Sequence, residues 1–242
     1  MIIKLYNKVK KDGLDSLWYR FLRLFNKNLL YNNLIEKRKF ENSIKLYDDN
    51  KNLILSGPYK DTKFSRDNFW GIGDLGAKIV GVYELEVQNK LIEIVNKFKI
   101  ENFINVGAAE GYHAVGLAKK TGIQNFILYE CDTKGQEILK RNIALNNINK
   151  NITIKGEAKI DNLLKLKNEI NLNKTLFIID IEGDESLILN NEVLNVLKNS
   201  HLIIENHSFL MNGINQKTYE KFVNNLNQVF NLEKIHNSYR NI

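Results

Sequence analysis

Residues 103–114 read FINVGAAEGYHA, and this stretch decides the expected fold. Phe103, Ile104 and Val106 are typical of a buried strand. Gly107 and Gly111 then permit a tight turn, because glycine tolerates backbone conformations that a Cβ disfavours. Small and apolar residues at helical spacing follow. A strand, a glycine turn and a helix start in this order predict a cofactor cradle, although the same turn can serve only to pack a helix on a strand.

A second predicted strand, residues 126–129, strengthens the cofactor interpretation because it ends at Glu130, nineteen residues beyond Gly111. An acid at that distance usually binds ribose hydroxyls. Cys131 comes next and is the only cysteine, so no internal disulfide can form. We expect it to be a small residue at a crowded turn rather than a nucleophile.

From residue 103 onward, apolar strands alternate with helical segments. Predicted strands are residues 103–106, 126–129, 152–154, 176–179, 202–204 and 232–235, and predicted helices are 111–121, 133–146, 160–168, 185–197 and 216–229. Near-continuous apolar strands between helices indicate a parallel sheet covered on both faces, hence a doubly wound α/β fold. Ligands bind such sheets at the carboxyl ends of the strands, where Gly156-Glu157, Asp180-Ile181-Glu182 and Glu205-Asn206-His207 are found.

The first 40 residues differ from the rest in charge. They hold ten basic and three acidic residues, which accounts for the whole net charge of +7. Residues 14–25 predict an amphipathic helix that packs on the main domain or contacts a membrane surface or an acidic polymer. Residues 29–47 predict a further helix, and another is predicted to begin at residues 81–84 and to run to about Lys99. Residues 59–76 are irregular and aromatic, which is consistent with a substrate lid or a packed linker.

We therefore expect a basic helical appendage over residues 1–77 and a cofactor-binding domain over residues 78–242. No apolar run reaches the length that spans a membrane, and the N-terminus lacks the apolar core of a signal peptide. The expected location is the cytoplasm.

The chain resembles class I S-adenosylmethionine (SAM)-dependent methyltransferases, and among them the FkbM-type group. The resemblance covers about residues 78–236 and rests on residues 105–111, Glu130, residues 180–185 and residues 205–207. It implies a Rossmann-like fold, SAM as cofactor and transfer of a methyl group. It also implies a seventh strand, but only seven residues follow residue 235, so the last strand looks short or missing.

By this resemblance the cofactor contacts would come from the turn and the first strand ends. Gly107, Ala109 and Gly111 would line the methionine part, Glu130 would hold the ribose, and Asp180 would face the transfer centre. Gly156, Glu157 and Ala158 would border the adenine, and the other expected contacts are Asn105, Glu110, Tyr112 and Cys131. Two residues depart from the family pattern, since Asn105 replaces a frequent acid and Ala109 replaces the middle glycine.

Methyl transfer to a hydroxyl needs a base, and the candidates at the strand ends are Asp180, Glu182 and His207. His207 has the most suitable unperturbed pKa, although it could simply be a strand-end histidine bonded to backbone. Asp180, Glu205 and Asn206 also offer oxygen ligands for Mg²⁺. A hydrogen-bonded acidic cluster without metal is the favoured interpretation of these three.

The leading hypothesis is an O-methyltransferase for a sugar, glycan or small-molecule hydroxyl. Methyltransferases for nucleic-acid amines carry an Asx-Pro-Pro-aromatic motif, which is impossible here because Pro58 is the only proline, so no specific nucleic acid is expected as a partner. A nicotinamide-dependent oxidoreductase would need Gly-x-Gly-x-x-Gly, whereas this turn has Gly-x-x-x-Gly. A non-catalytic protein that keeps the SAM pocket is the third alternative.

Overall fold

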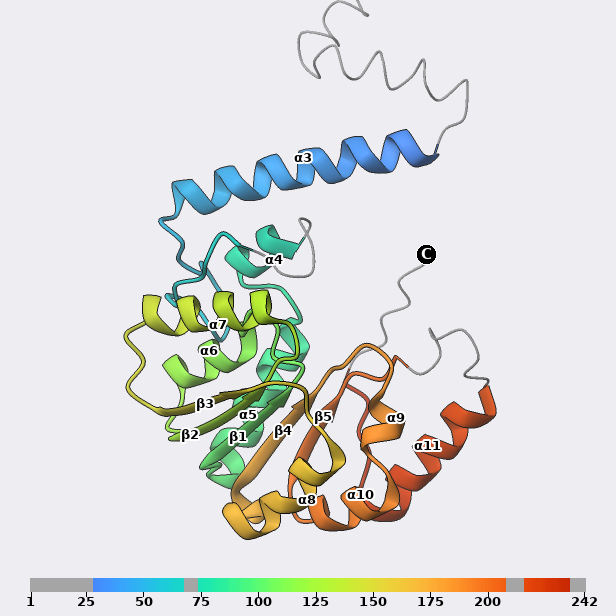
Figure 1. Cartoon of the computed structure of the whole chain (residues 1–242). Coiled ribbons are helices and arrows are strands. Elements are labelled where there is room, and N and C mark those ends of the chain that lie inside the picture. The colour runs from blue at the N-terminus through green and yellow to red at the C-terminus, as the bar shows by residue number, and fades with distance from the viewer. Residues whose placement is uncertain (1–27, 68–73, 208–215, 236–242) are drawn as a thin grey trace, which may run out of the picture.

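The computed structural model describes residues 28–67, 74–207 and 216–235. The centre of that part is a five-stranded parallel sheet in the order β3-β2-β1-β4-β5 (Figure 1). The strands are β1 (Asn102–Val106), β2 (Asn125–Tyr129), β3 (Asn151–Lys155), β4 (Thr175–Ile179) and β5 (His201–Ile204). Five of the six predicted strands and the doubly wound Rossmann-like α/β fold are thereby confirmed.

The helices agree with the predicted ones within a few residues, with three differences. The described helices are α3 (Asn28–Asp49), α4 (Asp74–Val80), α5 (Leu85–Phe98), α6 (Tyr112–Lys120), α7 (Thr133–Leu145), α8 (Ile160–Glu169), α9 (Glu185–Ile188), α10 (Asn191–Leu197) and α11 (Gln216–Val229), and there is a short 3-10 turn, η1 (Leu172–Lys174). The pattern did not predict α4 or η1. It also predicted α9 and α10 as one helix, but Asn190 accepts a hydrogen bond from the Val193 amide at 3.0 Å and begins a new helix there.

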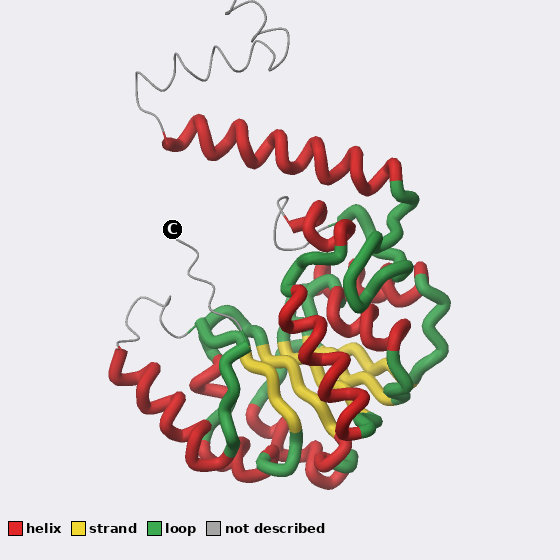
Figure 2. Tube along the Cα trace, turned by 180° about the vertical axis from the view of Figure 1, so that it is seen from behind, coloured by secondary structure: helices red, strands yellow, loops and turns green. Residues whose placement is uncertain are grey.

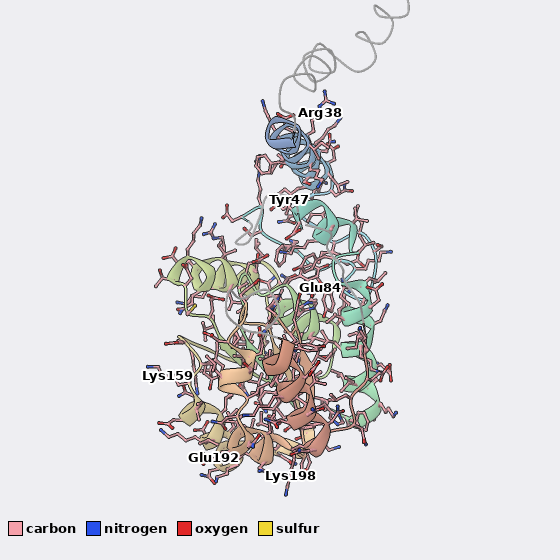
Figure 3. All side chains as sticks on the ribbon, turned by 90° about the vertical axis from the view of Figure 1, so that its right-hand side faces the viewer. Arg38, Tyr47, Glu84, Lys159, Glu192 and Lys198 are labelled. Atoms are coloured by element: carbon pink, nitrogen blue, oxygen red, sulfur yellow. The ribbon has the colours of Figure 1, made fainter. Side chains whose placement is uncertain are left out.

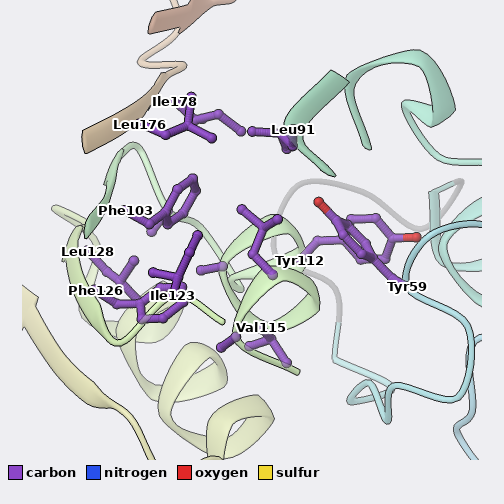
Figure 4. Close-up of a cluster of buried hydrophobic side chains, with 14 of the residues drawn as sticks. Tyr59, Leu91, Phe103, Tyr112, Val115, Ile123, Phe126, Leu128, Leu176 and Ile178 are labelled. Atoms are coloured by element: carbon purple, nitrogen blue, oxygen red, sulfur yellow. The ribbon is translucent and has the colours of Figure 1, made fainter. Parts of the chain in front are cut away.

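Both faces of the sheet are buried, as the alternation along β1 requires. Phe103 packs on one face with Leu91 of α5 and Leu117 of α6 (Figure 4). Ile104 faces the other side, with Leu163 of α8 and Leu194 of α10. Figure 2 shows the resulting layers, with helices in front of and behind the strands. Helices thus cover the strands on both faces of the sheet, which explains why the strands carry few polar residues.

Described residues on both sides of positions 68–73 belong to the core of the sheet domain. Ile54, Tyr59, Phe64, Leu75 and Ile79 are each at most 1% exposed and lie in the same cluster as the first face of the sheet. Tyr59 and Phe64, in the segment predicted as a lid or a packed linker, are thus packed in the core; residues 68–73 lie outside the described part. The division of the chain at residue 78 stays a prediction.

The strand predicted at residues 232–235 is wrong. Residues 231–235 have no regular secondary structure, and Leu232 is 47% exposed. Glu233 instead pairs with Lys90 of α5, with 2.8 Å between Oε2 and Nζ. Apolar residues form a strand only where a neighbouring strand pairs with their backbone, whereas this segment lies beside a helix.

The predicted helix at residues 14–25 lies outside the described residues. The helix predicted at 29–47 is confirmed as α3, which stands away from the sheet and carries Arg38 far from it (Figure 3). Its last turns pack on α4, where a Cβ at Gly76 would lie 2.6 Å from Ser43 Oγ. Among the described residues, none of the helices combines the length and the apolar character needed to cross a membrane.

Candidate functional site

The site lies where the strand order reverses. β1 has β2 on one side and β4 on the other, so the connections that leave β1 and β4 diverge to opposite faces of the sheet. In open parallel sheets this divergence creates the ligand crevice, outside the carboxyl ends of the strands. The predicted residues after β1, β2, β4 and β5 all belong to this one edge.

Three residues of the turn after β1 have positive φ angles: Gly107 at 85°, Ala109 at 45° and Gly111 at 82°. A Cβ on Gly107 would lie 1.7 Å from the backbone oxygen of Asp180, and one on Gly111 would lie 2.2 Å from Leu139 Cδ1. Backbone packing therefore requires Gly107, whereas Gly111 is favoured mainly by its positive φ, because Leu139 Cδ1 is the end of a flexible side chain. For Gly107 this packing presses the turn against the end of β4, which brings the two halves of the crevice together.

Glu130 joins the end of β2 to this turn. Its side chain is buried, its Oε2 accepts a hydrogen bond from the Ala109 amide at 2.6 Å, and its Oε1 accepts one from the Asp132 amide at 2.8 Å. Ionised carboxylates have about four lone-pair positions, so each oxygen retains one for a ligand hydroxyl. Gly135 of α7 lies close to the Glu130 side chain, since a Cβ at Gly135 would be only 3.0 Å from Glu130 Cγ.

The predicted residues beyond β2 and β3 are more open. Cys131, Gly156 and Glu157 are exposed, and Ala158 is half-buried against the second core. Partial burial, followed by the nearby Glu130 carboxylate, raises the pKa of Cys131, which disfavours the reactive thiolate. This outcome agrees with the expectation that Cys131 is not a nucleophile.

Three other predicted contacts are turned into the protein. Asn105 is 3% exposed and donates to the Gly107 carbonyl at 3.4 Å. The carboxylate of Glu110 pairs with Lys78 of α4 inside the core. Tyr112 lies among aromatic side chains, with its ring centroid 5.4 Å from each of the rings of Tyr59, Phe64 and Tyr83. These contacts give Tyr112 a packing role, and direct cofactor contacts of the three residues stay predictions.

On the other half of the crevice, one imidazole lies among four carboxylates. His207 Nδ1 is 3.2 Å from Glu185 Oε1 and 3.7 Å from Asp180 Oδ1. His207 Nε2 is 3.3 Å from Glu205 Oε1 and 3.8 Å from Glu182 Oε2. The structure thus brings all three predicted catalytic residues together.

This crowding changes the proton affinities of the two central groups. Hydrogen bonds to Glu185 and Glu205 raise the pKa of His207 to about 10, against the opposing effect of its burial. Burial, followed by the charge of Glu205, raises the pKa of Asp180 to about 8. At neutral pH His207 is consequently an imidazolium, which cannot accept a proton. Asp180 titrates close to neutrality, where a general base is most effective.

Glu185 was not given a role by the sequence, yet it organises this half of the site. It is fully buried, and its Oε1 accepts hydrogen bonds from the Gly183 amide at 3.0 Å and from His207 Nδ1 at 3.2 Å. Its position as the first residue of α9, five residues after Asp180, was the available signal. Asp180, Glu185 and His207 also form a group whose potential metal-ligating atoms all lie within 4.8 Å of one another. This group differs from the predicted oxygen set of Asp180, Glu205 and Asn206.

A second chain of polar residues borders the crevice at the start of α5. Tyr59 Oη is 3.1 Å from His113 Nδ1, and His113 Nε2 is 2.9 Å from Glu84 Oε2. Burial opposes ionisation of Glu84, but the hydrogen bond and charge of His113 prevail and lower its pKa to about 2. Figure 3 places Glu84 between α3 and the end of the molecule that carries Lys198. Both ring nitrogens of His113 are thus engaged by protein groups.

Comparisons with known proteins give likenesses of fold. No family model matches the sequence, and no curated protein matches it. An O-methyltransferase from Bacillus cereus in complex with S-adenosylhomocysteine (SAH) is 18% identical with a TM-score of 0.43, over 59% of this chain and 67% of that one. A candidate O-methyltransferase from Klebsiella pneumoniae is 15% identical with a TM-score of 0.42, over 57% of this chain and 64% of that one.

Coclaurine N-methyltransferase bound to N-methylheliamine and SAH is 14% identical with a TM-score of 0.36, over 85% of this chain and 62% of that one. This chain thus spans about two thirds of the length of the solved structures that it resembles. Likeness at this level assigns neither an activity nor a substrate to the chain. What the structure itself establishes is a Rossmann-like α/β domain with polar side chains gathered beyond the carboxyl ends of its strands, at the switch point.

Proposed function

We propose that this chain is a SAM-dependent methyltransferase that acts on a hydroxyl group of a sugar, glycan or small molecule. One observation supports it most: the buried Glu130 carboxylate is hydrogen-bonded to the Ala109 amide of the glycine turn. An acid that holds ribose and a turn that approaches the rest of a nucleoside cofactor thus meet at one point, beside the switch point.

The residues at the crevice fit a cofactor with a positive centre. Asp180 Oδ1 is buried and makes no hydrogen bond within the described part of the chain, although it lies 3.7 Å from His207 Nδ1. Carboxylates attract a sulfonium electrostatically, and a bound sulfonium would in turn favour the ionised form of Asp180. Glu130 would accept hydrogen bonds from the ribose hydroxyls, Ala158 and its neighbours would border the adenine, and the backbone of the turn would face the methionine part. Nicotinamide cofactors are the weaker alternative because the turn lacks the second close glycine.

When bound, SAM supplies an electrophilic methyl group. Asp180 would accept the proton of the acceptor hydroxyl, since its pKa of about 8 leaves part of the population ionised at neutral pH. His207, protonated and held by Glu185, would donate a hydrogen bond and orient Asp180 or the acceptor oxygen. This assignment exchanges the roles that the sequence favoured, because the neighbouring carboxylates remove His207 from the bases.

Membership of the FkbM-type group, with a sugar or glycan acceptor, is the finer part of this proposal and rests on the motifs at residues 180–185 and 205–207. Contact of residues 1–40 with a membrane surface or acidic polymer is proposed from their charge alone. Mg²⁺ forms no part of the proposed chemistry.

The acceptor is the main unknown of this proposal. Transfer of labelled methyl groups from SAM to fractions of cell-envelope glycans, lipids and small molecules would identify its class. Incorporation that is lost on hydrolysis of sugars supports a glycan acceptor. A thermal shift with SAM and SAH but no incorporation into any fraction would favour the non-catalytic alternative.

A further inference from the structure

A buried ion pair joins α4 to the cofactor turn. Lys78 Nζ of α4 contacts Glu110 Oε1, and the two side chains are only 3% and 2% exposed. Glu110 lies in the turn itself, between Ala109 and Gly111. The pair therefore links a helix from the N-terminal third of the chain to the backbone that we place next to the cofactor.

The turn needs external support because its own conformation is unfavourable. Ala109 is held at a φ of 45°, in the left-handed region that is unfavourable for a residue with a Cβ. Three contacts from different elements hold the turn: Glu130 accepts from the Ala109 amide, Asn142 of α7 donates to the Glu110 carbonyl at 2.8 Å, and Lys78 binds the Glu110 carboxylate.

Stability alone is a weak reason for such a pair. Buried ion pairs can often be replaced by apolar residues without loss of stability, since removing two charges from water offsets most of their attraction. This pair carries a further cost, because Glu110 Oε2 is buried and no described residue donates a hydrogen bond to it. What the pair achieves, and an apolar pair would not, is a fixed direction for the Glu110 side chain and hence for the turn.

We propose that Lys78 and Glu110 are positioning residues for the cofactor, which makes α4 a part of the cofactor site. The inference rests on the proposed function, and it revises the role predicted for Glu110 from a cofactor contact to a support of the turn. Lys78 also lies 4.6 Å from the centroid of the Tyr83 ring, next to Glu84 at the crevice, so the same ammonium group connects the turn with the start of α5.

The test replaces the pair by apolar side chains of similar length, K78M/E110M. The variant removes both charges together, so it leaves no unpaired buried charge and should fold. We expect its affinity for SAH to fall about tenfold, and hydrogen exchange of the Ala109 and Gly111 amides in the free protein to accelerate by a similar factor. K78Q/E110Q also removes both charges but keeps a polar pair of similar shape, and serves if the apolar variant does not fold; we expect both effects at reduced size.

A matched control is N102A, which disrupts buried polar contacts at the opposite edge of the sheet, where Asn102 is 5% exposed and bonds to Asn125 and Thr175. It should lower stability but leave the affinity and the exchange of the turn unchanged. Parental affinity and exchange in a folded K78M/E110M variant would overturn the inference. Accelerated exchange at the turn in a protein that never binds SAH would sink the proposed function and leave the support of the turn standing.

Discussion

The two halves of the crevice are built differently. At β1 and β2, the buried carboxylate of Glu130 has a backbone donor for each oxygen, and the turn is fixed by three elements. At β4 and β5, four carboxylates surround His207, and Asp180 Oδ1 is buried without a hydrogen bond in the described part of the chain. The first half is thus held in place by hydrogen bonds, as the proposed cofactor site requires. In the second half the pKa values of Asp180 and His207 are shifted, which is typical of a site that moves protons.

Substitution of Asp180 should give the largest effect on turnover. D180N keeps the shape but cannot accept the acceptor proton, so turnover should fall roughly 10²–10⁴-fold. SAH affinity should change little, as measured by calorimetry. D184N, an exposed acid four residues away, is the matched control. If the turnover of D180N stays close to that of the parent, with or without EDTA, Asp180 takes no part in the chemistry. If EDTA lowers the turnover of the parent but not that of D180N, the role of Asp180 would be to bind a metal ion.

Loss of Glu130 should affect the other half, and binding rather than chemistry. E130A should weaken SAH by about 1.5–3 kcal/mol, the effect of losing a charged hydrogen-bond acceptor. Calorimetry of E130A beside E101A, an exposed acid at the opposite edge of the sheet, checks the prediction once circular dichroism shows that both are folded. Equal affinities of the two variants would contradict the role of Glu130 at the ribose.

The pH dependence should report the catalytic half. Turnover should rise as Asp180 ionises near pH 8 and fall as His207 loses its proton near pH 10. Both pKa values are raised in the folded state, so the native protein binds more protons than the unfolded chain. Asp180 thus makes unfolding easier as pH rises from about 4 to 8, and the stability that His207 contributes disappears between about 6.5 and 10.

These assignments can be separated by variants measured across that range. D180N should lose the rise near pH 8, and H207Q should lose the fall near pH 10. Denaturant unfolding should show the stability gap between the parent and H207Q narrowing as pH rises from 6.5 to 10. A gap that stays constant over this range would mean that His207 is already neutral in the folded protein, and would restore it as a candidate base.

Removal of the basic N-terminal segment should have the smallest effect on binding. A chain that starts at Asn52 keeps Ile54 and the other core residues of the sheet domain. If folded, it should bind SAH within about twofold of the full chain, because every cofactor residue predicted from the sequence lies between residues 105 and 180. A start at residue 78 removes Tyr59, Phe64 and Leu75 from the core and should not fold. A folded chain from Asn52 without affinity would place part of the cofactor site in the first 51 residues.

The features that could be predicted from the sequence are those that local patterns encode. The apolar strands, the glycine turn and Glu130 at the second strand end follow from spacing along the chain, and the sheet fixes their shared edge. The last strand was mispredicted, because an apolar pattern near Leu232 does not say whether a neighbouring strand exists. The protonation of His207 was also beyond the sequence, since it depends on carboxylates from the ends of two strands and from α9. The pairing of Lys78 with Glu110, 32 residues apart, is likewise a tertiary contact.

The central claim is that the half of the crevice at β1 and β2 binds a SAM-type nucleoside. Isothermal titration of the full chain with SAH tests it most directly, with NAD titrated under the same conditions. We predict saturable binding of one SAH per chain and none of NAD. Binding of NAD in place of SAH, or of neither, by a folded protein would contradict the account.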